Sequence, residues 1–362
     1  MKRMTRVALI TSGGDCQGLN AAIRGVGKAL FERFGNDVEI YGMYDGYRGL
    51  VECDYKFMEP RDFSGILTEG GTILGTSRQN YIPGKDIVDD EGNSLIPHMK
   101  TTYNRLNLDC LIIMGGNGTQ KSAKLIADAG MNVVTLPKTI DNDIYGTDFT
   151  FGFHTAVDIA TECIDRLHTT ASSHGRTMVV EIMGNKAGWL TLYAGVAGGA
   201  DVILLPEIPY DIKEVAKAVG DRAKSKKAFS IVAVAEGAMS KEEAKMKKKE
   251  RAEFRSTLPY DCISKRIAVE LQELAGVEAR AVVPGHIQRG GSPSAYDRVL
   301  STQFGVHAAE LIRDEIYGVT VALDGNEIIH NKLKDIAGVP KPVPKDDHVL
   351  VTARNMGINL GD

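Results

Sequence analysis

Short apolar runs alternate along this chain with longer amphipathic stretches, and this alternation restricts the fold more than any other feature. The apolar runs at residues 6–11 and 109–114 are typical of buried strands, and helical patterns follow them at 19–34 and from about 119 to 130. Further strands are expected at residues 131–136, 177–182, 201–205, 229–235 and 280–283, and further helices from about 156, 212 and 261. Alternating strands and helices predict an α/β fold whose mostly parallel sheets carry helices on both faces.

Length and composition indicate a globular protein with room for two domains. The 362 residues suffice for two separate cores, and the hydrophobic and charged fractions, 43% and 25%, lie in the globular range. A formal net charge of -4 gives no general attraction to nucleic acid or membrane, and no apolar stretch approaches the roughly 20 residues that span a bilayer. Five scattered cysteines without a Cys-x-x-Cys pair fit a reducing cytosol. We therefore expect a soluble, cytoplasmic protein with no nucleic-acid or membrane partner.

One lysine-rich run, at residues 241–251, has the charge that a nucleic-acid contact would need. Glutamates are interspersed in it, and no aromatic side chains lie between the lysines to stack on bases. We therefore interpret this run as a solvated helix.

A group of polar residues follows the apolar run at 131–136, where Pro137 ends the predicted strand. In an extended segment alternate side chains share a face, so Thr139, Asp141 and Asp143 would point the same way. Two carboxylates and a hydroxyl beside a lysine suit proton transfer and metal binding. The alternative is an Asx-type turn, since Asp-Asn-Asp is also favourable turn chemistry. The segment alone does not decide between these two interpretations.

Two glycine-rich loops join a predicted strand to a predicted helix. The first, residues 12–20, has the sequence Ser-Gly-Gly-Asp-Cys-Gln-Gly-Leu-Asn, whose glycines allow the backbone to approach an anion at a helix N-terminus. A tight turn without a ligand needs similar glycines, and the spacing is not that of a dinucleotide fingerprint. The second, residues 115–122, resembles a P-loop, but Gln120 stands where the glycine before the lysine belongs, so we reject a P-loop.

Five short motifs extend over nearly the whole chain. They are Ser-Gly-Gly-Asp, Gly-Gly-Asn-Gly-Thr, Pro-Lys-Thr-Ile-Asp-Asn-Asp, Met-Gly and Gly-His-Ile-Gln-Arg-Gly-Gly, beginning at residues 12, 115, 137, 183 and 285. These motifs, in this order, resemble those of the 6-phosphofructokinase family, and the resemblance extends from about residue 6 to at least residue 298. NAD kinases and lipid kinases share the second motif but not the other four.

The resemblance implies transfer of a phosphoryl group from ATP to carbon 1 of D-fructose 6-phosphate, which gives D-fructose 1,6-bisphosphate in glycolysis. It implies that Asp141 is the general base, that Asp143 and Asn117 lie near Mg2+, and that Thr139 contacts the substrate. We add Lys138 to this catalytic group. The residues implied on the phosphoryl-donor side are Gly14, Arg78, Gln79, Gly116, Asn117, Gly118 and Thr119.

The resemblance also implies a basic site for the sugar phosphate. Its residues would be Thr139, Ile140, Asp141, Arg176, Met183, Gly184, Asn185, Glu236, Arg280, His286, Ile287, Gln288 and Arg289. His286 and Arg289 are three residues apart, so one helical turn would direct both at the same ligand. In the family Arg176 and Arg280 come from a neighbouring subunit, which implies a homo-oligomer, with a tetramer expected and a dimer as the alternative.

The family architecture implies two Rossmann-like three-layer α/β/α domains with the active site in the cleft between them. Residues 1–151 together with about 288–338 would form the domain that binds the phosphoryl donor. Residues 152–287 together with about 339–362 would form the domain that binds fructose 6-phosphate.

The chain departs from the usual family pattern at several positions. Asn117 replaces an aspartate, so the metal should depend more on Asp143 and on the phosphates. Asn185 stands where many relatives have an arginine that stabilises the transferred phosphoryl group, and an asparagine cannot neutralise developing charge. We expect Lys138 to take over this role because it lies three residues before Asp141.

Two residues give opposite indications about the phosphoryl donor. In the family Gly118 goes with ATP, because a carboxylate there would crowd the phosphates of the nucleotide, whereas Lys138 is typical of the pyrophosphate-dependent branch. The combination resembles a third, mixed branch whose members use ATP, pyrophosphate or both. We favour ATP, since the absent side chain admits the nucleotide and a lysine suits either donor. The alternatives are a pyrophosphate-dependent or dual-donor enzyme and, more remotely, a catalytically silent regulatory subunit.

Overall fold

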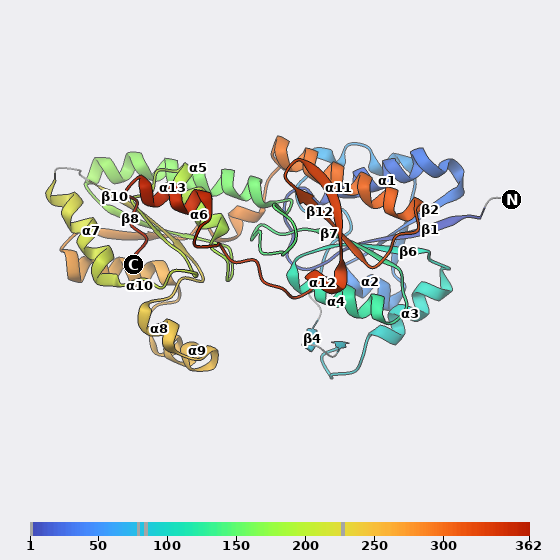
Figure 1. Cartoon of the computed structure of the whole chain (residues 1–362), viewed down its shortest axis with the longest axis horizontal. Helices are drawn as coiled ribbons and strands as arrows, with labels where there is room; N and C mark the ends of the chain where they lie inside the picture. Colours follow the sequence, from blue (N-terminus) through green and yellow to red (C-terminus); the bar gives the residue numbers. More distant parts are fainter. Residues whose placement is uncertain (1–2, 78–79, 83–85, 226–228) are drawn as a thin grey trace. The chain divides into compact units, whose positions relative to one another are not determined.

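The computed structural model of the chain (Figure 1) describes residues 3–77, 80–82, 86–225 and 229–362. The chain folds into two compact units, each built from two stretches of sequence. Unit 1 comprises Met1–Thr155 and Arg289–Lys341, and unit 2 comprises Ala156–Gln288 and Pro342–Asp362. None of the described helices is long and apolar enough to cross a membrane.

Unit 1 is organised around a mixed sheet. Its strands are β1 (Thr5–Thr11), β2 (Val38–Met43), β3 (Tyr55–Met58), β6 (Cys110–Gly115), β7 (Val133–Pro137), β12 (Val319–Asp324) and β13 (Glu327–Lys332). They lie in the order β13-β12-β7-β6-β1-β2-β3. The central strands are parallel, and the edge strands β3 and β13 pair antiparallel with their neighbours. Separately, β4 (Asn80–Ile82) pairs antiparallel with β5 (Asp86–Val88).

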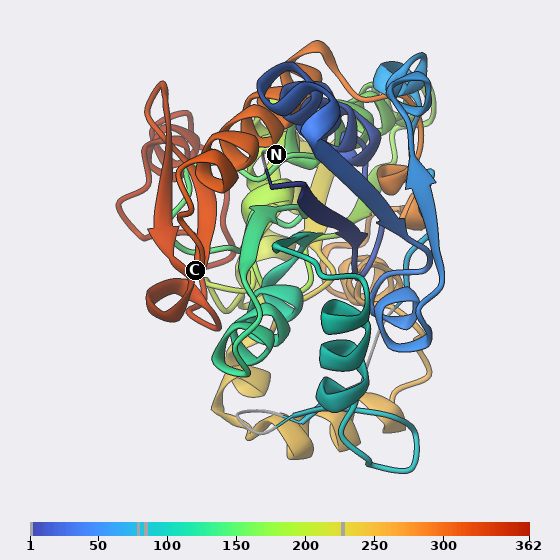
Figure 2. The same ribbon diagram turned by 90° about the vertical axis from the view of Figure 1, so that its right-hand side faces the viewer.

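Helices cover both faces of this sheet, as Figures 1 and 2 show. On one face α1 (Leu19–Phe34) packs closely against α11 (Ala295–Arg313). The crossing needs small residues, since a Cβ on Gly25 would lie 2.8 Å from the backbone oxygen of Thr302. The other face carries α2 (Tyr47–Glu52), α3 (Ile96–Arg105), α4 (Asn117–Asp128) and α12 (Leu333–Ile336). The connections include the 3-10 helices η1 (Gly35–Asp37), η2 (Pro60–Phe63) and η3 (Ile66–Thr68).

Unit 2 contains a smaller, fully parallel sheet. Its strands are β8 (Thr177–Ile182), β9 (Val202–Leu204), β10 (Ser230–Ala235) and β11 (Ala279–Val282), in the order β11-β8-β10-β9. One face packs against α7 (Ile212–Lys224) and α10 (Ile263–Ala275). The other face carries α5 (Phe153–His174), α6 (Trp189–Ala197) and α13 (His348–Asn355). Two short helices, α8 (Lys241–Lys245) and α9 (Lys248–Thr257), follow β10, and the 3-10 helix η4 (Gly285–Arg289) follows β11.

Alternating side chains of the central strands are buried on both faces of the unit 1 sheet. In β1, Ala8 and Ile10 belong to the core beneath α2, α3, α4 and α12. The neighbouring Val7 and Leu9 are equally buried and point to the opposite face. A parallel strand covered on both faces needs apolar residues at every position, which accounts for the continuous apolar runs in the sequence.

The α/β class predicted from the sequence is confirmed, and the bounds of several elements agree with the prediction. The helix expected at 19–34 is α1, and the strand expected at 177–182 is β8. The lysine-rich run at 241–251 differs, because it forms parts of two helices instead of one. The backbone of Met246 and Lys247 is extended between α8 and α9, which separates them.

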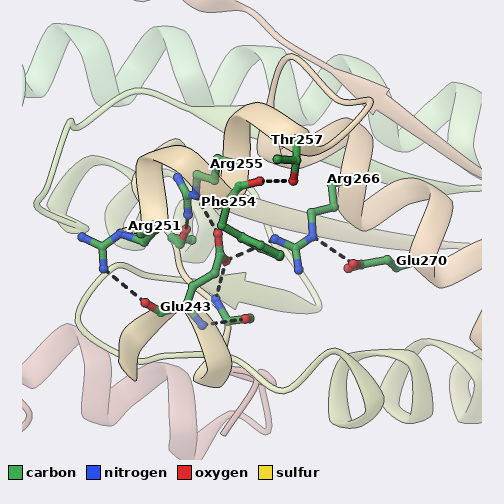
Figure 3. A network of polar contacts seen from close by, with 9 residues as sticks. Glu243, Arg251, Phe254, Arg255, Thr257, Arg266 and Glu270 are labelled. Atoms are coloured by element: carbon green, nitrogen blue, oxygen red, sulfur yellow. Dashed lines mark hydrogen bonds and ion pairs between the residues drawn. The ribbon is translucent and has the colours of Figure 1, made fainter. Parts of the chain in front are cut away.

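A buried carboxylate holds α8 and α9 in place (Figure 3). The side chain of Glu243 is fully buried, and its oxygens lie 2.7 Å from Nε of Arg255 and 3.2 Å from a guanidinium nitrogen of Arg266. It also accepts a hydrogen bond from the backbone N–H of Ser240. Burial alone would raise the pKa of Glu243, but the Arg255 and Ser240 hydrogen bonds and the arginine charges outweigh it and lower the pKa.

We expect Glu243→Gln to lower the free energy of unfolding by about 2 kcal/mol at pH 7, because two arginines would lose their buried counter-charge. Since the folded pKa of Glu243 lies below its unfolded value of about 4.3, this contribution is present above pH 4.3 and is lost as the pH falls through the folded pKa. Urea unfolding at pH 7 and at pH 3 measures both effects. Glu253→Gln, which alters an exposed helical pair with Lys249, is the control and should change stability by less than about 0.5 kcal/mol.

Candidate active site

Three adjacent strands of unit 1 end in the motifs that the sequence analysis singled out. β7 pairs with β6 and β6 pairs with β1, all in parallel. Parallel strands bring their carboxyl ends to one edge of the sheet, where ligands of α/β folds bind. That edge therefore carries the first glycine loop (residues 12–20), the second glycine loop (residues 115–122) and the segment 137–143 that contains Asp-Asn-Asp.

The two glycine loops are linked to each other and to β6. The backbone N–H of Ser12 donates to the oxygen of Met114 at 2.9 Å, and the Thr119 hydroxyl lies 3.3 Å from the Ser12 hydroxyl. Glycine is required at position 115, since a Cβ there would lie 2.3 Å from atoms of the Thr119 side chain. Gly13 has a φ of +82°, which disfavours any residue with a side chain. Close packing and backbone conformation thus account for glycines at these two positions.

The second glycine loop begins helix α4 and leaves its first backbone N–H groups available. Gly116 precedes Asn117, the first residue of α4, and no side chain caps the helix there. Uncapped N–H groups and the helix dipole favour an anion at this position. Gly118 is exposed, and no atom lies within 4 Å of where its Cβ would be. Packing within the described protein therefore gives no reason for glycine at position 118.

Lys138 lies beneath these loops with its ammonium group buried. Its Nζ donates a hydrogen bond to the backbone oxygen of Gly14, and its own backbone N–H donates to the oxygen of Gly115 at 3.1 Å. Burial lowers the pKa of Lys138, and the nearby charges of Asp141 and Asp15 act in the opposite direction. The side chain thus connects the end of β7 to the first glycine loop.

The Asp-Asn-Asp segment is a turn and does not continue β7 as an extended segment. The hydroxyl of Thr139 accepts a hydrogen bond from the backbone N–H of Asp141 at 3.1 Å, which closes a local turn. Asn142 has a φ of +51°, so the side chains from 139 to 143 do not simply alternate between two faces. Of the two backbone conformations considered, the turn is therefore the one present, and the Thr139 hydroxyl closes it.

Asn142 is a residue that the sequence analysis did not assign to the site. Its fully buried side chain accepts from the backbone N–H of Thr150 at 3.1 Å and donates to the oxygen of Asp148 at 3.2 Å. The hydroxyl of Thr150 in turn donates to the backbone oxygen of Thr139 at 2.6 Å. Segment 148–150 therefore fixes the turn that presents Asp141. The sequence gives one signal for this role, since asparagine tolerates the left-handed conformation better than most residues.

Asp143 and Arg289 are further predicted residues of unit 1, and the predicted Ile140 is fully buried. Burial raises the pKa of Asp143, while the charges of Lys341, Lys138 and Lys121 act to lower it. A guanidinium nitrogen of Arg289 donates to the backbone oxygen of Asp15 at 3.0 Å, next to Gly14. Arg78 and Gln79, predicted on the donor side, lie outside the described residues.

A second group of predicted residues gathers in unit 2, at the carboxyl ends of β8 and β10. The carboxylate of Glu236 accepts hydrogen bonds from the backbone N–H groups of Gly184 at 3.1 Å and Asn185 at 2.6 Å. The side chain of Gln288 accepts from the N–H of Met183 at 3.2 Å. Asn185 has a φ of +54°, a conformation that asparagine adopts at lower cost than arginine.

His286 and Ile287 are exposed on η4, where Ile287 retains 67% of its accessible surface. Residues three apart eclipse in a 3-10 helix, so the single turn expected for His286 and Arg289 is present in η4.

Arg176 and Arg280 lie at the opposite end of the unit 2 sheet. Arg176 immediately precedes β8 and Arg280 is the second residue of β11. Both guanidinium groups pair with the same oxygen of Glu278, at 2.8 and 2.7 Å. β8 has six residues, so at about 3.3 Å per residue its length separates Arg176 from Met183 by roughly 20 Å. Within unit 2 the structure does not bring these two arginines to the group around Glu236.

A cavity of about 600 Å³ in unit 2 lies away from all predicted site residues. Its walls come from α6, α7 and the C-terminal segment, and two ion pairs, Asp201–Arg222 and Arg354–Asp362, are among its lining residues.

Sequence comparison gives relatives over the full length of the chain. The family model described as phosphofructokinase matches residues 6–312. The chain is 53% identical to the ATP-dependent 6-phosphofructokinase of Spirochaeta thermophila, over 98% of this chain and 97% of that relative. It is 45% identical to ATP-dependent 6-phosphofructokinase 3 of Bacteroides thetaiotaomicron, over 98% of this chain and 100% of that relative.

Comparison with solved structures also gives phosphofructokinases. The pyrophosphate-dependent phosphofructokinase from Nitrosospira multiformis has a TM-score of 0.80 at 18% identity, covering 99% of this chain and 93% of that chain, which shows the shared fold. Phosphofructokinase of Pichia pastoris has a TM-score of 0.77 at 30% identity, covering 92% of this chain but 35% of that much longer chain. With a family model matched over most of its length and full-length relatives at up to 53% identity, the chain belongs to the phosphofructokinase family.

Proposed function

We propose that this protein is an ATP-dependent 6-phosphofructokinase, which phosphorylates D-fructose 6-phosphate to D-fructose 1,6-bisphosphate in glycolysis. The observation that carries the proposal is the common edge of β7, β6 and β1, where two glycine loops lie beside the turn that presents Asp141. The similarity to ATP-dependent 6-phosphofructokinases along the full chain supports it. The five cysteines are free thiols, which suits a reducing cytoplasm as the compartment.

In the proposed reaction Asp141 is the general base. The 1-hydroxyl oxygen of the sugar attacks the γ-phosphorus of ATP, its proton passes to the Asp141 carboxylate, and the bond from the γ-phosphorus to the bridging oxygen breaks to release ADP. Thr139 holds the Asp141 backbone through its hydroxyl, and Asn142 holds the turn through Thr150. Such a positioned base typically contributes about 10²- to 10⁴-fold to the rate.

Mg2+ is part of the proposal, with Asp143 and Asn117 as its protein ligands. Their oxygens suit a hard cation, and Mg2+ usually takes one or two carboxylates beside waters and substrate phosphates. In the part of the chain that the structure describes, no three His, Cys, Asp or Glu side chains are grouped to hold a metal by themselves. The phosphates of the donor would therefore have to supply further ligands. Bound there, Mg2+ would offset negative charge on the transferred group.

In the proposal the phosphoryl donor binds at the uncapped start of α4 and at Gly14, and fructose 6-phosphate binds to the residues around Glu236. Glu236 orders the backbone of the Met-Gly-Asn turn, and we assign Met183, Gly184 and Asn185 to contacts with the sugar. The list for the sugar further contains Thr139, Ile140, His286, Ile287, Gln288 and Arg289. We therefore propose, as from the sequence, that the domain containing residues 1–151 binds the phosphoryl donor and that the domain containing residues 152–287 binds fructose 6-phosphate.

The position of Arg176 and Arg280 supports a homo-oligomer. Along β8, Arg176 lies roughly 20 Å from Met183, and Arg280, which lies beside Met178, lies roughly 16 Å from it, yet both belong to the family's sugar-phosphate site. A second copy of the chain would supply them, as in closed symmetric assemblies in which each subunit completes the site of another. We propose a tetramer built on such pairs.

ATP is the proposed donor because Gly118 has no structural reason to be glycine. Its backbone conformation is ordinary, and no atom of the described residues lies within 4 Å of where its Cβ would be, which leaves this space for a nucleotide phosphate. Pyrophosphate is the second candidate because Lys138 is typical of the pyrophosphate-dependent branch of the family, although a buried lysine would suit either donor.

Initial rates of fructose 1,6-bisphosphate formation, with Mg2+ and either ATP or pyrophosphate, test the donor. We expect activity with ATP in the wild type and a loss of at least about 100-fold with ATP in Gly118→Asp, because a carboxylate would oppose the donor phosphates. Gly220→Asp is the matched control, because Gly220 lies in α7 of unit 2 and a Cβ there would meet only the Ala275 side chain, at 3.8 Å. A preference of the wild type for pyrophosphate would contradict the steric argument, and no turnover with either donor would leave only the silent regulatory subunit.

Lys138→Met tests whether this lysine stabilises the transferred phosphoryl group. We expect kcat to fall by about 100- to 1000-fold while the KM for fructose 6-phosphate changes less than about twofold, since a fixed positive charge acts mainly on the transition state. Lys124→Met, at an exposed lysine of α4 paired with Asp128, is the matched control and should keep its activity. Retention of wild-type kcat in a folded Lys138→Met protein would refute the assignment.

Mixing two inactive variants tests the shared site. Arg280→Ala and Asp141→Asn should each be nearly inactive, whereas subunits exchanged between them should recover about a quarter of wild-type activity under random two-fold pairing. Activity can recover only if Arg280 of one chain and Asp141 of another chain belong to the same active site. If the exchanged mixture is no more active than its two parents, each site is built from a single chain.

A further inference from the structure

A buried aspartate of unit 1, outside the predicted site, lies at the N-termini of two helices, α11 and α5. Asp297 is the third residue of α11, and its side chain is fully buried. Ser294 caps α11 by accepting a hydrogen bond from the Asp297 backbone N–H at 3.3 Å. The Asp297 carboxylate is therefore not needed as the cap of its own helix and points to a different segment.

The carboxylate of Asp297 accepts its hydrogen bonds from the beginning of α5. Its Oδ1 accepts from the backbone N–H of Gly152 at 3.0 Å, and its Oδ2 accepts from the N–H and the hydroxyl of Thr155 at 2.8 and 2.5 Å. The Thr155 hydroxyl also accepts from the N–H of Ser294 at 2.9 Å. Three donors from the start of α5 thus converge on one carboxylate, and both of its oxygens act as acceptors.

Gly152 is directly connected to the turn that presents Asp141. The preceding Phe151 pairs with β7, its N–H donating to the oxygen of Pro137 at 3.3 Å. The residue before it, Thr150, holds Thr139 and Asn142 through the hydrogen bonds described above. Gly152 also has a φ of +95°, and a Cβ there would lie 2.5 Å from Sγ of Cys16, so this stretch has little freedom to shift.

We propose that Asp297 is a positioning residue for the proposed base Asp141. By fixing Gly152 and Thr155 it holds segment 150–152, and that segment holds Thr139 and Asn142 on either side of Asp141. The inference rests on the proposed function for its catalytic part. It extends that function to a residue that touches neither substrate and that lies beyond the Gly-His-Ile-Gln-Arg-Gly-Gly motif.

Asp297→Asn tests the proposal because it keeps the size of the side chain but turns one acceptor into an NH2 group facing N–H and O–H donors. We expect kcat to fall about 10- to 100-fold, with the KM values for fructose 6-phosphate and ATP within about twofold of wild type, since small displacements of a base cost rate. Hydrogen exchange should become faster in peptides covering 138–152 and remain unchanged in β1.

Glu243→Gln is the matched control, since it neutralises another fully buried carboxylate in unit 2 and should destabilise the protein without changing kcat. If Asp297→Asn does not fold, the pair Thr155→Val and Thr155→Ser replaces it. Thr155→Val removes one of the three donors and should lower kcat several-fold, and Thr155→Ser, which keeps the hydroxyl, should restore it.

An unchanged kcat in folded Asp297→Asn, or an equal loss in Glu243→Gln, would overturn the proposal. Exchange that rises equally across unit 1 would overturn it as well, because the aspartate would then stabilise the fold in general. If the wild type made no fructose 1,6-bisphosphate, the proposed function would fail on its own. The exchange experiment would still decide whether Asp297 fixes segment 138–152.

Discussion

The parallel pairing of β7, β6 and β1 is the constraint on which the candidate site depends. In register, Thr11 lies beside Met114, and Gly115 lies beside Pro137, so the three strands end within one or two residues of each other. Hydrogen bonds from Ser12 to Met114 and from Lys138 to Gly115 continue this pairing past the strand ends. A shift of register by one residue would turn every buried side chain to the opposite face, so the cores on both faces of the sheet fix the positions of the loops.

The same edge explains why a lysine can be buried there. An isolated ammonium group in the interior would be strongly unfavourable, and burial lowers the pKa of Lys138 accordingly. The Gly14 oxygen and the charges of Asp141 and Asp15 offset part of this cost. A phosphate bound at the uncapped start of α4 would offset more of it. A buried lysine and an anion bound at the start of α4 would therefore stabilise each other.

The sequence predicted the elements well because their signals are local, and it predicted the tertiary contacts poorly because theirs are not. The apolar periodicity of 19–34 is enough to define α1, and Pro137 is enough to end β7. The sequence left the conformation of residues 139–143 open between an extended segment and a turn. The conformation depends on Thr150, which forms hydrogen bonds to Asn142 and Thr139 from eight and eleven residues away. Asp297 was missed altogether. Its partners lie 142 and 145 residues earlier in the chain, and no local pattern marks an aspartate near a capping serine as unusual.

Sheet geometry limits which residues of unit 2 the arginine pair can reach within one chain. A parallel sheet has two ends, and one end of the unit 2 sheet carries Glu236 while the other carries Arg176 and Arg280. One chain cannot bring both ends of a rigid sheet to the same ligand, because β8 keeps them roughly 20 Å apart. If both ends bind the sugar phosphate, two copies must exchange them, and a two-fold axis makes the exchange reciprocal. Glu278 holds the two guanidinium groups together, so that a partner would meet a preformed cationic pair.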